Sequence, residues 1–176
     1  NRLAAHDIRS AKLIWHVGGD QDDYDLPLAG AFFLGPPLPL MQQVYALAEI
    51  KGEIRLLALA ADTGELLWSQ QLAVVEQNIL QDPLRRLSGV SPSYADGVLV
   101  CPTSNGAVVA VQLATRSLLW GYQYASNDRN HRNRILAVRV HGYHNPNAAS
   151  RWEDSTLALA DGTVVATPID SEELHC

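Results

Sequence analysis

One tryptophan pattern recurs along this chain at an almost constant spacing. Trp15, Trp68 and Trp120 are separated by 53 and then 52 residues. Each tryptophan closes one copy of the pattern, and the copies read AHDIRSAKLIW, ALAADTGELLW and AVQLATRSLLW. Repeats of about this length mark solenoids or propellers, because one repeat alone cannot bury its apolar faces. The spacing therefore predicts blades of a β-propeller, each a four-stranded antiparallel sheet.

Strand signals dominate the rest of the sequence. Short apolar segments, many of them β-branched, lie at 56–60, 98–102, 108–112, 157–160 and 164–168. The turn signals between them are Asp62-Thr63-Gly64, Asp96-Gly97, Asn105-Gly106 and Asp161-Gly162. Asp-Gly and Asn-Gly supply the positive φ angles of tight hairpins, so these segments are expected to pair as strands. The segment 72–87 is expected to hold one short helical turn at most.

Aligning the blades on their tryptophans divides the chain. A single propeller domain, 1–176, is expected to contain a part blade (1–17), two blades (31–75 and 89–124), an insertion loop (125–151) and a second part blade (155–176). Prolines place the innermost strand of the first blade at 33–40. The chain is expected to start and stop in third strands, as a piece of a longer propeller; an eight-bladed ring would need roughly 420 residues. Unpaired strand edges then predict aggregation or edge-to-edge dimers.

Composition excludes several classes of function. The net charge of −6 and the pI near 5.4 argue against binding nucleic acid, because phosphate binding requires a basic face. No apolar run reaches the roughly 18–20 residues that cross a bilayer, so no transmembrane segment is predicted. Cys101 and Cys176 form no CxxC motif and are expected to be free thiols.

The three copies resemble the tryptophan-docking repeat of PQQ-like β-propellers, the quinoprotein alcohol dehydrogenase-like superfamily, whose repeat reads roughly AxDxxxGxxxW. The matching residues are Ala5, Asp7, Trp15, Ala58, Gly64, Trp68, Ala110 and Trp120. The resemblance implies that each tryptophan packs against the neighbouring blade. The copies depart from the pattern at Ala60 and Gln112 in place of Asp, and at Ala11 and Arg116 in place of Gly.

Side chains that could perform chemistry are sparse. The acidic cluster Asp20, Asp22, Asp23 and Asp25 offers oxygen ligands but lacks the spacing of an EF-hand loop. His141 and His144 offer two imidazoles where zinc needs three or four ligands. Both segments are expected to be solvated loops. Ser91 and Ser93 are expected on an inner strand with no base beside them, so no catalytic, metal-binding or cofactor-binding residue is predicted.

The insertion 125–151 is the candidate binding surface. It carries five arginines against one acid, and long loops in compact domains often have a function. The residues singled out are Arg129, His131, Arg132, Arg134, Arg139, His141 and His144. They could bind an anionic ligand or a protein, pair with the acidic cluster, or stay in water. Trp152 is expected to pack the insertion onto the ring.

Two interpretations of function follow. The first is a non-catalytic propeller, a scaffold or a ligand- or protein-binding module of a larger bacterial protein, whose partners include the remaining blades. The alternative is part of a dehydrogenase that uses pyrroloquinoline quinone and calcium and has its catalytic residues elsewhere. The absence of adjacent cysteines, which many such enzymes carry, favours the first. The resemblance also implies an extracytoplasmic location.

Overall fold

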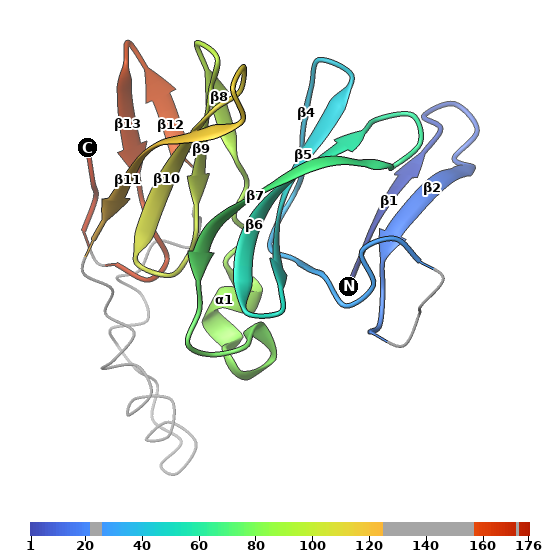
Figure 1. Ribbon diagram of the computed structural model, residues 1–176, viewed down its shortest axis with the longest axis horizontal. Helices are drawn as coiled ribbons and strands as arrows, with labels where there is room; N and C mark the ends of the chain where they lie inside the picture. The colour runs from blue at the N-terminus through green and yellow to red at the C-terminus, as the bar shows by residue number, and fades with distance from the viewer. Residues whose placement is uncertain (22–25, 125–156, 172) are drawn as a thin grey trace.

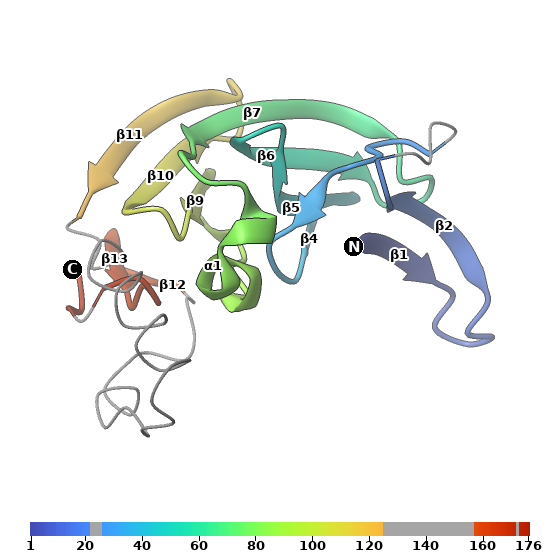
Figure 2. The same ribbon diagram turned by 90° about the horizontal axis from the view of Figure 1, so that it is seen from below.

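The computed structural model describes residues 1–21, 26–124, 157–171 and 173–176. Four antiparallel sheets follow one another along an arc (Figures 1 and 2). The N-terminal half blade contains β1 (Arg2–His6) and β2 (Leu13–Gly18). Blade I contains β3 (Phe32–Phe33), β4 (Leu38–Leu40), β5 (Gln43–Ile50), β6 (Glu53–Ala60) and β7 (Leu66–Val74). Blade II contains β8 (Ser93–Ala95), β9 (Val98–Pro102), β10 (Ala107–Gln112) and β11 (Ser117–Gln123), and the C-terminal half blade contains β12 (Leu157–Ala160) and β13 (Thr163–Ala166).

The expected all-β fold, a partial propeller with two blades and two part blades, is confirmed. Two short helical segments, η1 (Ile79–Gln81) and α1 (Pro83–Leu87), interrupt the strands. Figure 2 shows α1 on the inner side of the arc, with β7 and β11 along its outer rim. Among the described residues, no helix is long and apolar enough to cross a membrane.

The alanine and the tryptophan of each copy are cross-strand partners. Ala5 pairs with Trp15, Ala58 with Trp68 and Ala110 with Trp120. A β-bulge follows the alanine in every case, because the register shifts immediately after it. A small residue directly opposite leaves space for an indole on the same face of the sheet. The bulge adds twist and ends the regular pairing just before the turn.

The turn between the alanine and the tryptophan is also the same in all three copies. Ala11, Gly64 and Arg116 occupy its left-handed position, with φ of 56°, 73° and 57°. Their amides donate to the carbonyls four residues earlier at 2.8, 2.9 and 2.8 Å. The turn therefore does not require the glycine of the repeat, although an alanine or arginine there adopts a costly left-handed backbone.

Two of the tryptophans contact the turn of the next blade. The Nε1 of Trp15 donates to the carbonyl oxygen of Ala61 at 2.9 Å. Gly64 lies so close to the indole that a Cβ atom there would approach Trp15 to 2.6 Å. The guanidinium of Arg116 lies 5.8 Å from the ring centroid of Trp68, within the range of a cation–π contact.

The hydrophobic core lies between the blades rather than within one sheet. The largest cluster joins Leu47 and Leu56 of blade I to Leu99 and Val111 of blade II. Two smaller clusters join blade I to Val17 of β2, and blade II to the C-terminal half blade. Each fully buried leucine contributes about 1.5–3 kcal/mol. Stability therefore depends on neighbouring blades covering one another's faces.

Two expectations about local structure were wrong. The innermost strand of blade I is not continuous over 33–40, because Gly35, Pro36 and Pro37 separate β3 from β4. The two prolines lack amide donors, and Gly35 packs against the backbone of Gly89 and Val90 with no space for a Cβ atom. The segment 72–87 contains two helical pieces rather than one turn at most. Both cysteines are free, with Cys101 buried and Cys176 exposed.

Replacing Gly64 by alanine tests the contact between Trp15 and the turn. We expect Gly64→Ala to lower the free energy of unfolding by about 2–4 kcal/mol, because it adds left-handed strain and an overlap with the indole. Gly97→Ala is the control, since Gly97 has the same backbone but its Cβ would meet only Gln112, at 3.5 Å. Urea unfolding of both variants gives the comparison. Equal losses would show that the indole contributes nothing.

Candidate functional site

The connection between blade I and blade II, residues 75–92, carries two capped helical segments and a buried ion pair. Its two helical segments begin at residues that cap them. The side chain of Asn78 accepts from the amide of Leu80 at 2.9 Å, and Asp82 Oδ1 accepts from the amide of Arg85 at 3.1 Å. Pro83 occupies the first position of α1, and Gly89, with φ of 63°, follows its end. The local sequence therefore specifies a compact, ordered connection.

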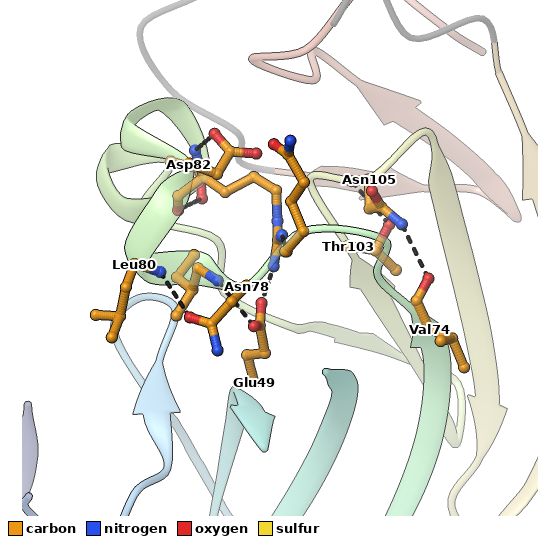
Figure 3. Close-up of polar contacts among 11 residues, drawn as sticks. Glu49, Val74, Asn78, Leu80, Asp82, Thr103 and Asn105 are labelled. Carbon is orange, nitrogen blue, oxygen red and sulfur yellow. Dashed lines mark hydrogen bonds and ion pairs between the residues drawn. The ribbon is translucent and has the colours of Figure 1, made fainter. Parts of the chain in front are cut away.

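A buried ion pair holds this connection against blade I (Figure 3). Glu49, near the end of β5, pairs with Arg85 of α1, and both side chains are almost fully buried. The second carboxylate oxygen of Glu49 accepts from the amide of Ile79 at 2.9 Å. Arg85 also donates to the carbonyl of Gln77 at 2.9 Å. Its Nε has no hydrogen-bond partner among the described residues. A charge buried in this way is tolerated only while its partner is present.

A second set of contacts ties the same end of blade I to blade II. Asn105, in the turn between β9 and β10, donates to the carbonyl of Val74 at the end of β7 (3.3 Å; Figure 3). Thr103 closes that turn by donating to the carbonyl of Ala107 at 2.7 Å. The connection therefore begins at the end of β7, and that strand end is itself hydrogen-bonded to blade II.

Two leucines of the connection are exposed, whereas its ion pair is buried. Leu80 and Leu87 are 68% and 79% exposed, and Arg86 is exposed beside Leu87. Ile79 is buried in the core between the blades. The backbone that carries both leucines is tied to blade I by the ion pair of Glu49 and Arg85. Loops that a rigid scaffold holds in place often carry binding residues. We name Leu80, Arg86 and Leu87 the connection face.

A second polar cluster joins the end of the chain to blade II. The carboxylate of Asp170 accepts from the hydroxyl of Tyr124 at 2.7 Å and from the amide of Gly106 at 2.8 Å. Burial, with the Asp170 charge as a smaller cause, raises the pKa of Tyr124 far above its usual range. His175 lies 3.1 Å from the hydroxyl of Ser171, which is buried and accepts from the amide of Glu173. These hydrogen bonds hold Asp170 against blade II and His175 against Ser171.

The metal-ligating side chains of the described residues do not gather into one site. No group of three or more His, Cys, Asp or Glu side chains in the described ranges is placed to hold a metal ion. The whole sequence also lacks the adjacent cysteines that the resemblance implies for many quinone enzymes. No catalytic step through pyrroloquinoline quinone is assigned to the described residues.

The structure places some of the predicted residues and leaves others outside its described ranges. The docking residues Ala5, Asp7, Trp15, Ala58, Gly64, Trp68, Ala110 and Trp120 lie in the pairs and turns given above. Asp20 is exposed, and Asp22, Asp23 and Asp25 lie outside the described residues. So does the candidate binding surface Arg129, His131, Arg132, Arg134, Arg139, His141 and His144, together with Trp152. Ser93 is on β8 and donates to the carbonyl of Leu157 at 3.0 Å; Ser91 precedes that strand.

The sequence pattern did not predict the connection face or the ion pair that anchors it. A signal for the helix was present, because Asp82-Pro83 is a start signal and Gly89 a stop signal. The sequence gives only a weak signal for the ion pair of Glu49 and Arg85, because Glu49 is a single acid in the apolar segment 44–50. Its partner, Arg85, lies 36 residues away in the sequence, and only the fold brings the two together.

The fold and the repeated turn define a β-propeller of the PQQ-like repeat class. Residues 1–173 match the model of the family described as "Outer membrane protein assembly factor BamB", and the chain belongs to that family. Among curated protein sequences, none matches significantly.

Similar solved structures have low sequence identity to this chain. BamB from Moraxella catarrhalis is 18% identical, with a TM-score of 0.52, over 71% of this chain and 35% of that one. The computationally designed Ika8 protein is 14% identical (TM-score 0.48; 96% and 37% covered). The quinohemoprotein alcohol dehydrogenase ADHIIG from Pseudomonas putida HK5 is 16% identical (TM-score 0.46; 69% and 24% covered). The chain spans about a third of the length of the BamB structure.

Removing one partner of the buried ion pair tests its role as the anchor of the connection. We expect Glu49→Gln to lower the free energy of unfolding by about 3–5 kcal/mol, because Arg85 would remain buried without a counter-charge. Glu53→Gln is the control, since the pair of Glu53 with Arg55 is partly exposed and contributes about 0–1 kcal/mol. Denaturant unfolding measures both. The double variant Glu49→Leu/Arg85→Met should be more stable than Glu49→Gln; if it is not, the buried charge is not the cause.

Proposed function

We propose that this chain is a non-catalytic propeller module that binds a protein partner through its connection face. The observation that carries the proposal is the exposure of Leu80 and Leu87 on a connection that a buried ion pair fixes in place. A flexible loop could turn its leucines inward, whereas this backbone cannot. Binding a partner would cover both leucines without the entropic cost of ordering a loop.

The partner inferred from this surface is a folded protein with apolar side chains and an acidic or carbonyl group near them. Leu80 and Leu87 would supply apolar contact, and the guanidinium of Arg86 would supply directional hydrogen bonds beside it. The family's description, an outer membrane protein assembly factor, supports both a protein partner and an extracytoplasmic location for this chain. The arginine-rich insertion 125–151 stays a second candidate surface, for an anionic ligand or a protein.

The test of the proposal combines binding with stability. We expect Leu80→Asp/Leu87→Asp to weaken binding to a purified partner by about 30-fold or more, because it places two carboxylates in an apolar contact. The unfolding midpoint should stay unchanged, since both side chains are exposed. Val74→Asp is the control, as Val74 is also exposed but lies at the end of β7. Equal weakening by the control would show that the connection face is not the site.

A cofactor titration separates this proposal from the dehydrogenase alternative. The full-length protein is mixed with pyrroloquinoline quinone and calcium, and absorbance and alcohol-dependent dye reduction are followed. A non-catalytic module should show neither saturable binding nor turnover. Turnover would overturn the proposal and direct attention to blades outside this chain.

A further inference from the structure

The turn between β9 and β10 contains the dipeptide Asn105-Gly106. Asparagine followed by glycine is chemically reactive, because glycine carries no side chain that would hinder its own amide nitrogen. In the reaction, the nitrogen of Gly106 bonds to Asn105 Cγ, the Cγ–Nδ2 bond breaks, and Nδ2 leaves as ammonia with the proton that Gly106 loses. Water then opens the resulting succinimide at either carbonyl, which yields aspartate or isoaspartate. The sequence therefore places an intrinsically reactive pair in a hairpin turn.

Both reacting groups are hydrogen-bonded to other sheets. Asn105 Nδ2 donates to the carbonyl of Val74 at the end of β7, at 3.3 Å (Figure 3). The amide of Gly106, a buried residue, donates to Oδ2 of Asp170 in the C-terminal half blade at 2.8 Å. Attack on Cγ requires the Gly106 nitrogen to lose its proton and turn toward Asn105, and the departure of ammonia requires Nδ2 to leave Val74. Both hydrogen bonds must break first, so the docked turn is unreactive.

The hydrogen bonds inside the turn do not protect the reacting groups. Thr103 donates to the carbonyl of Ala107 at 2.7 Å and accepts from the main-chain amide of Asn105 at 3.2 Å, and neither bond involves a reacting group. Ser104 has φ of 52°, a costly left-handed backbone for a residue with a Cβ atom. Its buried hydroxyl has no hydrogen-bond partner in the described part of the chain. Protection therefore comes from the two bonds to the neighbouring sheets.

We propose that Asn105 is a deamidation site, and that its reaction makes the undocking of this turn irreversible. At neutral pH the aspartate product presents only acceptor oxygens to the carbonyl of Val74, so the hydrogen bond to blade I cannot form again. The isoaspartate product lengthens the main chain and moves Gly106 away from Asp170. Each product also adds a negative charge to a turn that faces the Asp170 carboxylate.

The consequence falls on the junction of the two complete blades. Val74 is the last residue of β7, and the connection 75–92 begins directly after it. Deamidation therefore removes a contact that holds this strand end to blade II. The reaction needs only water and no partner, so it is separate from the proposed function.

Peptide mass spectrometry of the purified full-length protein at mildly alkaline pH measures the reaction at Asn105, and an isoaspartate methyltransferase assay identifies the product. We expect the folded protein to react at least about tenfold more slowly than the same protein in urea. Asp170→Ala should raise the rate in the folded protein by about tenfold or more, because it removes a hydrogen bond to a charged group. Ser93→Ala is the control and should react like the parent, since it removes the 3.0 Å hydrogen bond from Ser93 to Leu157, between the same two sheets, and leaves the turn intact.

The unmutated protein gives a second test that does not depend on the folding of a variant. As urea is raised below the unfolding transition, the deamidation rate should rise in proportion to the hydrogen-exchange rate of the Gly106 amide. The structural consequence is tested by Asn105→Asp, which should speed hydrogen exchange in the turn by about tenfold. Asn105→Ala, which removes the same donor without adding charge, should have a smaller effect.

Several results would overturn the proposal. One is a reaction at Asn105 that is equally fast in the folded and the unfolded protein, or that occurs in neither. Another is an unchanged rate in Asp170→Ala, or an equal increase in Ser93→Ala, which would assign the protection to general blade contact rather than to this turn. Parent-like hydrogen exchange in Asn105→Asp would show that the modified turn still docks.

Discussion

The contact between a tryptophan and the turn of the next blade is the interaction on which the rest of the structure depends. A single blade is a small sheet that cannot bury both faces, so the chain folds only if consecutive blades are held at one separation and angle. The indole does this with a large apolar surface and one directional hydrogen bond, from Trp15 to the carbonyl of Ala61. The core clusters then form between the sheets.

The small residue opposite the tryptophan makes that contact possible. Ala5, Ala58 and Ala110 leave the face of the sheet open where the indole lies, and the bulge beside each one turns the strand toward the left-handed residue of the turn. The residue at the left-handed position of the turn differs among the three copies, so the turn tolerates different side chains there. Gly64 accepts an indole in close contact, whereas Arg116 places its guanidinium near Trp68. The same turn backbone therefore allows two different contacts with the indole of the preceding blade.

The connection between the complete blades contains a buried ion pair and two exposed leucines. Glu49 and Arg85 are buried while Leu80 and Leu87 are exposed. A buried pair is seldom the most stabilising choice for an interior site, since hydrophobic residues of the same size often do as well. Its directional hydrogen bonds to Ile79 and Gln77 do, however, fix one conformation of the connection. That fixed conformation is what presents the leucines to solvent.

The sequence by itself determined the blade architecture, the positions of the turns and the family, because a pattern repeated at constant spacing requires the same local structure each time. It did not determine the broken inner strand of blade I, since that depends on the contact of Gly35 with Gly89 and Val90. It also did not determine the connection face. Asp82-Pro83 and Gly89 could have predicted a helix there, but not which of its side chains would be exposed. Only the tertiary structure decided that, by bringing Glu49 and Arg85 together across 36 residues, and long-range pairing of this kind leaves no periodic trace in a sequence.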